Sequence, residues 1–190
     1  MSVIYNKEIK INNEVVIEVK DNKKVFVKGS NAELFKDFSH ARNITIKKEK
    51  DTIIVQGLNN KKKSRSIVGT ISSHIKNMVK GSIADFTVIQ KIVYAHFPIN
   101  VRVEDDNVYI ENFLGERSPR VSKIYGDKTK VEVSGDDVIV SGPNIEQVTQ
   151  TAANITKKTK IKDKDPRVFQ DGIFKFKKLY ADTILWELKL

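Results

Sequence analysis

The sequence contains no cysteine, which excludes a disulfide framework, thiolate-bound zinc or iron–sulfur sites and a cysteine nucleophile. Glycine occurs only 9 times, and no P-loop, G-x-G-x-x-G or G-x-S-x-G motif is present. No apolar run approaches the roughly 20 residues of a membrane-spanning helix, and the start of the sequence lacks the uncharged apolar core of a signal peptide. We therefore expect a soluble, intracellular protein.

Residues that could support catalysis or metal binding are also few. The three histidines, His40, His74 and His96, are far apart and have no second ligand at a metal-binding spacing. The conspicuous carboxylate pairs, Asp105-Asp106 and Asp136-Asp137, lie beside turn residues, so turn chemistry explains them better than acid–base catalysis. We predict no catalytic residues, no metal, no cofactor and no small-molecule substrate, and thus no enzyme.

Positive charge is abundant and unevenly distributed. The 190 residues include 34 Lys and Arg against 24 Asp and Glu, which gives a formal charge of +10. Residues 1–80 carry about +9, residues 101–155 about −4, and residues 156–178 about +6. Localised positive blocks favour a polyanionic partner, although lysine-rich solvated loops would give a similar composition.

Short segments of alternating apolar residues predict strands, and the same order of elements occurs twice. In each half the strands are followed by a glycine, Gly57 or Gly142, and then by an amphipathic helix. The first helix has its apolar stripe from Ile67 to Val79 and is expected to end before Gly81. The second follows a capping-box start at Asn144 with Gln147. The predicted strands are 15–19, 25–27, 34–38, 44–46 and 53–55 in the first half, and 108–110, 131–133 and 138–140 in the second.

This repeat predicts an α+β fold of two duplicated domains, each a small, mainly antiparallel sheet covered by one α-helix. The predicted domains are residues 1–82, residues 83–178 with a basic tail, and a C-terminal extension, 179–190. The apolar stretch from Phe86 to Val103 connects the two copies without a Gly/Ser-rich linker.

The first basic cluster, Lys61, Lys62, Lys63 and Arg65, lies at the start of the first helix. Cations there oppose the helix dipole, so helix stability does not explain them. Basic side chains around free helix N–H groups are suited to phosphate, although a solvated loop is the simpler alternative.

The second basic cluster begins where the second helix ends, with Lys157, Lys158, Lys160, Lys162 and Lys164. One or two lysines stabilise a helix C-terminus, but five exceed that need. Arg167, Lys175, Lys177 and Lys178 continue the run among Phe169, Phe174 and Phe176. Interleaved basic and aromatic residues suit RNA, although core packing also explains the phenylalanines. A membrane surface would instead require lysines along the polar face of an amphipathic helix.

Four segments, in this order and at compatible spacing, resemble one known family. They are Ser73 to Gly81, Tyr94-Ala95-His96-Phe97-Pro98-Ile99-Asn100-Val101, Asn112 to Glu116, and Arg167-x-Phe169-x-Asp171-Gly172-Ile173-Phe174. The resemblance is to the universal sixth protein of the large ribosomal subunit, in its eukaryotic form (60S ribosomal protein nine), and covers roughly residues 1–178. It implies a duplicated fold and a structural protein that binds ribosomal RNA near the sarcin–ricin loop and the stalk base.

The resemblance also implies partners and a location. These are large-subunit ribosomal RNA and neighbouring ribosomal proteins near the stalk base, without a membrane, in cytoplasmic large subunits assembled in the nucleolus. The residues expected to contact RNA are Lys61, Lys62, Lys63, Arg65, His74, Lys76, Arg117, Arg120, Lys157, Lys158, Lys160, Lys162, Lys164, Arg167, Gly172, Lys175, Lys177 and Lys178. The alternative is a non-ribosomal adaptor whose lysines bind acidic proteins or anionic lipid.

Overall fold

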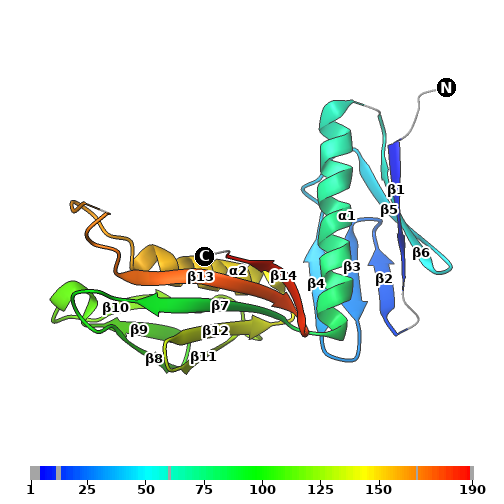
Figure 1. The fold of residues 1–190 in the computed structure, drawn as a ribbon. Coiled ribbons are helices and arrows are strands. Elements are labelled where there is room, and N and C mark those ends of the chain that lie inside the picture. The colour runs from blue at the N-terminus through cyan, green and yellow to red at the C-terminus, as the bar shows by residue number, and fades with distance from the viewer. Residues whose placement is uncertain (1–4, 12–13, 60, 166, 189–190) are drawn as a thin grey trace. The chain divides into compact units, whose positions relative to one another are not determined.

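A computed structural model describes residues 5–11, 14–59, 61–165 and 167–188. The chain forms two compact units, residues 1–84 and 85–190. Each contains two antiparallel sheets and one long α-helix, which confirms the predicted α+β class and its repeat (Figure 1). Each unit has two small sheets, where the sequence pattern predicted one.

Unit 1, residues 1–84, contains six strands and helix α1. Strands β1, β6 and β5 form one sheet, and β2, β3 and β4 form the other, in these spatial orders. The elements are β1 (Tyr5–Lys10), β2 (Val16–Lys20), β3 (Lys24–Lys28), β4 (Glu33–Asp37), β5 (Ile44–Glu49), β6 (Thr52–Gly57) and α1 (Lys62–Ile83). Apolar residues alternate along β3, β5 and β6, and their buried faces pack with the stripe of α1 in one core.

Helix α1 runs past Gly81 to Ile83, so the predicted end before Gly81 is wrong. The end of the helix is covered by the β3–β4 loop, where the backbone N–H of Asn31 donates to the carbonyl of Ser82 at 2.8 Å. A Cβ atom on Gly29 would lie 2.3 Å from that carbonyl oxygen, so glycine permits this close approach. Tertiary contacts therefore satisfy the carbonyls of the last turn and keep Gly81 helical.

Unit 2, residues 85–190, has a larger sheet of five strands in the order β11-β12-β7-β13-β14 and a second sheet in the order β10-β9-β8. Figure 1 shows β7 lying inside the larger sheet with β12 and β13 as its neighbours. The elements are β7 (Phe86–Val93), β8 (Asn100–Glu104), β9 (Asn107–Glu111), a 3₁₀ turn (Phe113–Gly115), β10 (Arg120–Lys123), β11 (Lys130–Ser134), β12 (Asp137–Gly142), α2 (Ile145–Lys158), β13 (Gly172–Tyr180) and β14 (Thr183–Glu187).

Helix α2 begins where the sequence indicated. The Asn144 side chain accepts a hydrogen bond from the backbone N–H of Glu146 at 3.0 Å, as an N-cap residue does. Gln147 packs against Gly126, where a Cβ atom would lie 2.3 Å from the Gln147 amide carbon. The buried side chains of α2, Val148, Ala152 and Ile155, complete a core with β7 and β12.

Residues 179–187 continue the larger sheet. Strand β13 crosses position 178, and β14 pairs with it antiparallel, so this part of the predicted extension belongs to a hairpin. Residues 189–190 of the extension lie outside the described residues. Among the helices that the structure describes, none is long and apolar enough to cross a membrane.

Candidate nucleic-acid interface

The lysines that follow α2 line a depression of about 490 Å³ in unit 2. We call residues 157–164 the basic segment, and this hollow the basic depression. The opposite wall comes from the 3₁₀ turn and β10, with Leu114, Glu116, Arg120 and Val121. The structure thus brings together six predicted residues from two stretches of sequence, Arg120, Lys157, Lys158, Lys160, Lys162 and Lys164.

Arg120 fixes the wall of this depression to the end of α2. Its guanidinium donates to both carboxylate oxygens of Glu116 at 2.6 and 2.7 Å and to the carbonyl of Lys158 at 2.6 Å, and lies 4.3 Å from the Phe113 ring centroid. The hydrogen bond from Arg120 lowers the pKa of Glu116. Arg120 was predicted to contact RNA directly, but these contacts make it mainly a positioning residue for the Lys158 backbone. Arg117, also predicted, is exposed beside it.

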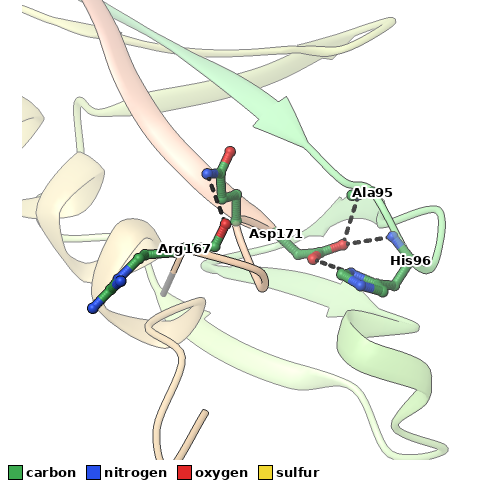
Figure 2. Close-up of polar contacts among 5 residues, drawn as sticks. Ala95, His96, Arg167 and Asp171 are labelled. Atoms are coloured by element: carbon green, nitrogen blue, oxygen red, sulfur yellow. Dashed lines mark hydrogen bonds and ion pairs between the residues drawn. The ribbon is translucent and has the colours of Figure 1, made fainter. Parts of the chain in front are cut away.

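The loop after the basic segment is anchored by Asp171 (Figure 2). Its buried carboxylate accepts hydrogen bonds from the backbone N–H groups of Ala95 (2.8 Å) and His96 (3.1 Å) and from Nδ1 of His96 (2.8 Å). Two of the sequence segments that resemble the ribosomal family therefore meet at this carboxylate. Asp171 lies within one of these motifs, but its contact with His96 was not predicted from the sequence.

Burial alone would raise the pKa of Asp171. The hydrogen bonds from the His96 ring and from the N–H groups of Ala95 and His96, together with the His96 charge, outweigh it and lower the pKa to about 2. The carboxylate is therefore ionised at neutral pH and holds the β7–β8 loop against residues 159–171.

An aromatic stack covers the same anchor. The His96 and Phe169 rings lie 4.7 Å apart at 21°, and the Lys164 ammonium is 4.7 Å from the Phe169 ring centroid. Arg167, four residues before Asp171, points away from the anchor in Figure 2, and its side chain is 92% exposed. Phe169 is thus a packing residue, whereas Arg167 and the lysines of the basic segment are open to a partner.

The predicted residues of β13 have several environments. Lys175 is exposed, with its ammonium 4.8 Å from the Trp186 ring centroid. Lys177 forms an ion pair with Glu187 at 2.7 Å. Burial, followed by repulsion from Lys175, lowers the pKa of Lys178. Gly172 is buried beneath the Phe174 ring, so it shapes the loop and does not present a surface to RNA.

The predicted residues of unit 1 do not form one cluster. Lys61, Lys62, Lys63 and Arg65 are exposed where α1 begins, and the Arg65 guanidinium lies 5.6 Å from the Tyr5 ring centroid. His74 is half-buried two turns later, where its Nδ1 lies 3.2 Å from the Lys36 ammonium. Lys76 is exposed on the same helix. Only the residues at the helix start remain a compact phosphate candidate.

One basic residue was missed by the site prediction. Lys123 of β10 lines a second hollow of about 480 Å³ together with Lys157 and Lys158. The antiparallel pairing of β10 with β9 places it there, and its sequence neighbours give no sign of the lysines beside it. Among the described residues, no group of three or more His, Asp or Glu could hold a metal ion.

Comparison with known proteins gives the same family in both units. A family model described as Ribosomal protein L6 matches residues 11–81 and 97–172. The large ribosomal subunit protein uL6 of Staphylothermus marinus is 49% identical over 170 residues, which cover 88% of this chain and 91% of that protein. The uL6 of Aeropyrum pernix is 48% identical, covering 81% of this chain and 84% of its own length. That of Methanosphaera stadtmanae is 52% identical, covering 73% and 75%.

Proposed function

This chain belongs to the ribosomal protein L6 family, and from that premise we propose that its basic segment binds large-subunit ribosomal RNA near the sarcin–ricin loop and the stalk base. As a uL6 protein it is a structural constituent of the large ribosomal subunit and not an enzyme, and its partners are ribosomal RNA and other ribosomal proteins. Family membership removes the alternative of a non-ribosomal adaptor.

The sequence resemblance specified a eukaryotic form with nucleolar assembly. The relatives compared are archaeal, so that specification and the nucleolus are not supported. A location in the large ribosomal subunit stands.

The observation that carries the RNA proposal is the basic depression. Five lysines within eight residues share one hollow, with Glu116 as its acidic lining residue, and that carboxylate is already paired with Arg120. The basic segment also contains the exposed Asp163, but its five lysines outnumber that carboxylate, and such concentrated, exposed positive charge suits the phosphates of folded RNA.

Contacts around the basic segment explain how its lysines can act together on one RNA. Arg120 holds the carbonyl of Lys158 near the start of the basic segment, and the Lys164 ammonium at its end lies 4.7 Å from the centroid of the Phe169 ring, which stacks on His96. Positioning lysines in advance reduces the ordering cost of binding. Lysines neutralise phosphate without reading bases, so we propose that recognition here follows the shape of the RNA.

The test is a salt titration of binding to an archaeal large-subunit ribosomal RNA fragment that contains the sarcin–ricin stem-loop and the stalk base. We expect the variant Lys157→Gln, Lys158→Gln, Lys160→Gln, Lys162→Gln to bind more weakly and to flatten the log–log salt slope by about 3, because each lost phosphate contact removes roughly 0.7–0.9. The control, Lys10→Gln, Lys47→Gln, Lys50→Gln, removes three exposed lysines of unit 1 and should keep the slope.

Hydroxyl-radical footprinting of the same complex locates the contact. We expect the wild type to protect the sarcin–ricin stem and the stalk base, and we expect the quadruple variant to lose this protection. Equal slopes for the quadruple variant and the control would show that the basic segment does not bind RNA. Protection elsewhere would contradict the proposed location while leaving RNA binding intact.

A further inference from the structure

A groove of about 930 Å³ lies next to the basic depression in unit 2. It is lined by α2, β7, β13 and the loop that ends at Asp171. Lys157, Lys160 and Ile161 line both hollows, so the basic segment forms their shared wall. From this groove we propose that unit 2 takes up an unpaired nucleobase of its bound RNA, an inference that rests on the proposed RNA binding.

The groove combines apolar surface with positive charge. Most of the groove surface is apolar, and Phe174, one of its lining side chains, is 45% exposed. Lys157, Lys160 and Lys175 also line it. A base has an apolar face for aromatic stacking and is attached to a phosphate that lysines attract, so it matches both properties.

The lining of the groove includes a buried hydrogen-bond acceptor that has no donor among the described residues. Gln90 of β7 lines the groove and is fully buried. Its Nε2 donates to the carbonyl of Ala152 at 3.0 Å and to the hydroxyl of Thr156 at 2.8 Å, but its Oε1 has no hydrogen-bond partner among the described residues. Each of the four RNA bases carries an N–H donor on its Watson–Crick edge, which is free only when the base is unpaired. A phosphate supplies no such donor.

An acidic residue, Asp171, also lines the groove. Asp171 would repel RNA if its charge faced the groove freely. Its side chain is 1% exposed, and its carboxylate already accepts three hydrogen bonds from Ala95 and His96. The exposed charge of the groove is therefore the positive charge of its lysines. This charge favours a nucleotide, which carries a phosphate, over a neutral peptide.

The first experiment uses the full chain and two RNA probes. One is a single-stranded oligoadenylate of eight nucleotides with one 2-aminopurine, and the other is the same strand in a duplex. At equal salt we expect tighter binding of the single strand, by about tenfold from one stacked base. The 2-aminopurine fluorescence should change on binding of the single strand only.

Two variants separate the base from the phosphates. Ala153→Phe places a bulky side chain in the groove from an exposed position of α2, and Phe174→Leu keeps an apolar side chain but removes the aromatic ring. Both should abolish the single-strand preference while leaving duplex affinity and the salt slope unchanged. Gln150→Phe, also on an exposed position of α2 but outside the groove lining, is the control and should behave as the wild type. Thermal melting checks that each variant is folded.

The second experiment uses the ribosomal RNA fragment and chemical probing of its unpaired bases. We expect the wild type to protect a discrete unpaired nucleotide that becomes reactive with Ala153→Phe. If Ala153→Phe binds the fragment with the same protections as the wild type, base uptake is wrong and RNA binding stands. If subunits reconstituted with Ala153→Phe lose a neighbouring protein while their base protections stay the same, the occupant is a peptide and the inference is overturned. If the wild type itself does not bind the fragment, the proposed function fails as well.

Discussion

The two units share one order of elements but differ at the strand that faces the helix. In unit 1, β1 is an edge strand, whereas in unit 2 the equivalent β7 is paired on both sides, with β12 and with β13. Ile9 of β1 pairs with Ile53, and Gln90 of β7 pairs with Val138 at the corresponding position. An apolar side chain of the first copy is therefore replaced by a buried amide in the second.

The helices show that the rest of the interface is repeated closely. The buried positions Val68, Ile71, Ser72 and Ile75 of α1 have the same spacing as Val148, Thr151, Ala152 and Ile155 of α2. The cores thus follow one plan, and the differences are concentrated around Gln90, the basic segment and the β13–β14 hairpin. The two units thus share a repeated scaffold, and in unit 2 the basic segment and β13, which are added to it, line the groove.

The largest expected effect tests whether the two cores are equivalent. Ile75 and Ile155 are both fully buried against their sheets, so Ile75→Ala and Ile155→Ala should each lower the free energy of unfolding of their own unit by about 3 kcal/mol. Trp186, the single tryptophan, reports unit 2 by its fluorescence, and amide hydrogen exchange reports unit 1. If Ile75→Ala shifted the Trp186 transition as much as Ile155→Ala, the two units would unfold as one.

The next effect is confined to unit 2. Asp171→Asn removes the charge that accepts three hydrogen bonds and should cost about 2 kcal/mol at neutral pH. The folded-state pKa of about 2 lies below the ordinary value of 3.8, so this stabilisation is present above about pH 4 and is lost as the pH falls towards 2. Trp186 fluorescence in denaturant, measured at pH 7, 4 and 2, checks it. Parallel pH profiles for wild type and variant would contradict the anchor.

Exchanging the residues that distinguish β1 from β7 gives a smaller effect. Ile9→Gln buries an amide among apolar side chains and should destabilise unit 1 by about 1.5 kcal/mol. Gln90→Ile removes two hydrogen bonds together with an unpartnered acceptor, so unit 2 should change by less than about 1 kcal/mol. Equilibrium denaturation measures both. A large loss of unfolding free energy in Gln90→Ile would mean that the Gln90 amide is needed for folding and that Ile9 and Gln90 are not equivalent in the two units.

The smallest effects come from an exposed ion pair in unit 1 and a half-buried ion pair in unit 2. Glu33→Gln breaks a pair with Lys28, and Glu187→Gln breaks a pair with Lys177. Since pairs at the surface contribute little, Glu33→Gln should unfold like the wild type, and Glu187→Gln should change the free energy of unfolding by no more than about 0.5 kcal/mol. A loss above about 1 kcal/mol in Glu187→Gln alone, in the same denaturation assay, would show that this pair holds the β13–β14 hairpin to the sheet.

Local patterns predicted the elements well, and long-range contacts account for what was missed. The alternation of apolar residues located β2 to β6, β9, β11 and β12, and the Asn144 cap located the start of α2, whereas β1, β10, β13 and β14 were not predicted. The end of α1 was misplaced because glycine frequently ends a helix, whereas here Ser82, next to Gly81, is covered by Asn31, which lies 51 residues earlier. A sequence window cannot contain such a contact.

The candidate site followed the same rule. The basic segment was visible as a run of lysines, but its pairing with the wall that holds Arg120 depends on the packing of β10 beside α2. Arg120 and Lys177 are basic in sequence, yet acidic neighbours, Glu116 and Glu187, occupy them. Charge can be counted from the sequence, whereas the fraction of it left free for RNA depends on these pairs.

The contact between Asp171 and His96 has a consequence for the order of synthesis. The strand and loop that contain His96 leave the translating ribosome 75 residues before their anchor does. Until Asp171 has emerged, the β7–β8 loop lacks the carboxylate that accepts three of its hydrogen bonds, and Phe169, which stacks on His96, precedes that carboxylate by only two residues. The anchored surface of unit 2 is therefore completed only after most of the polypeptide has been synthesised.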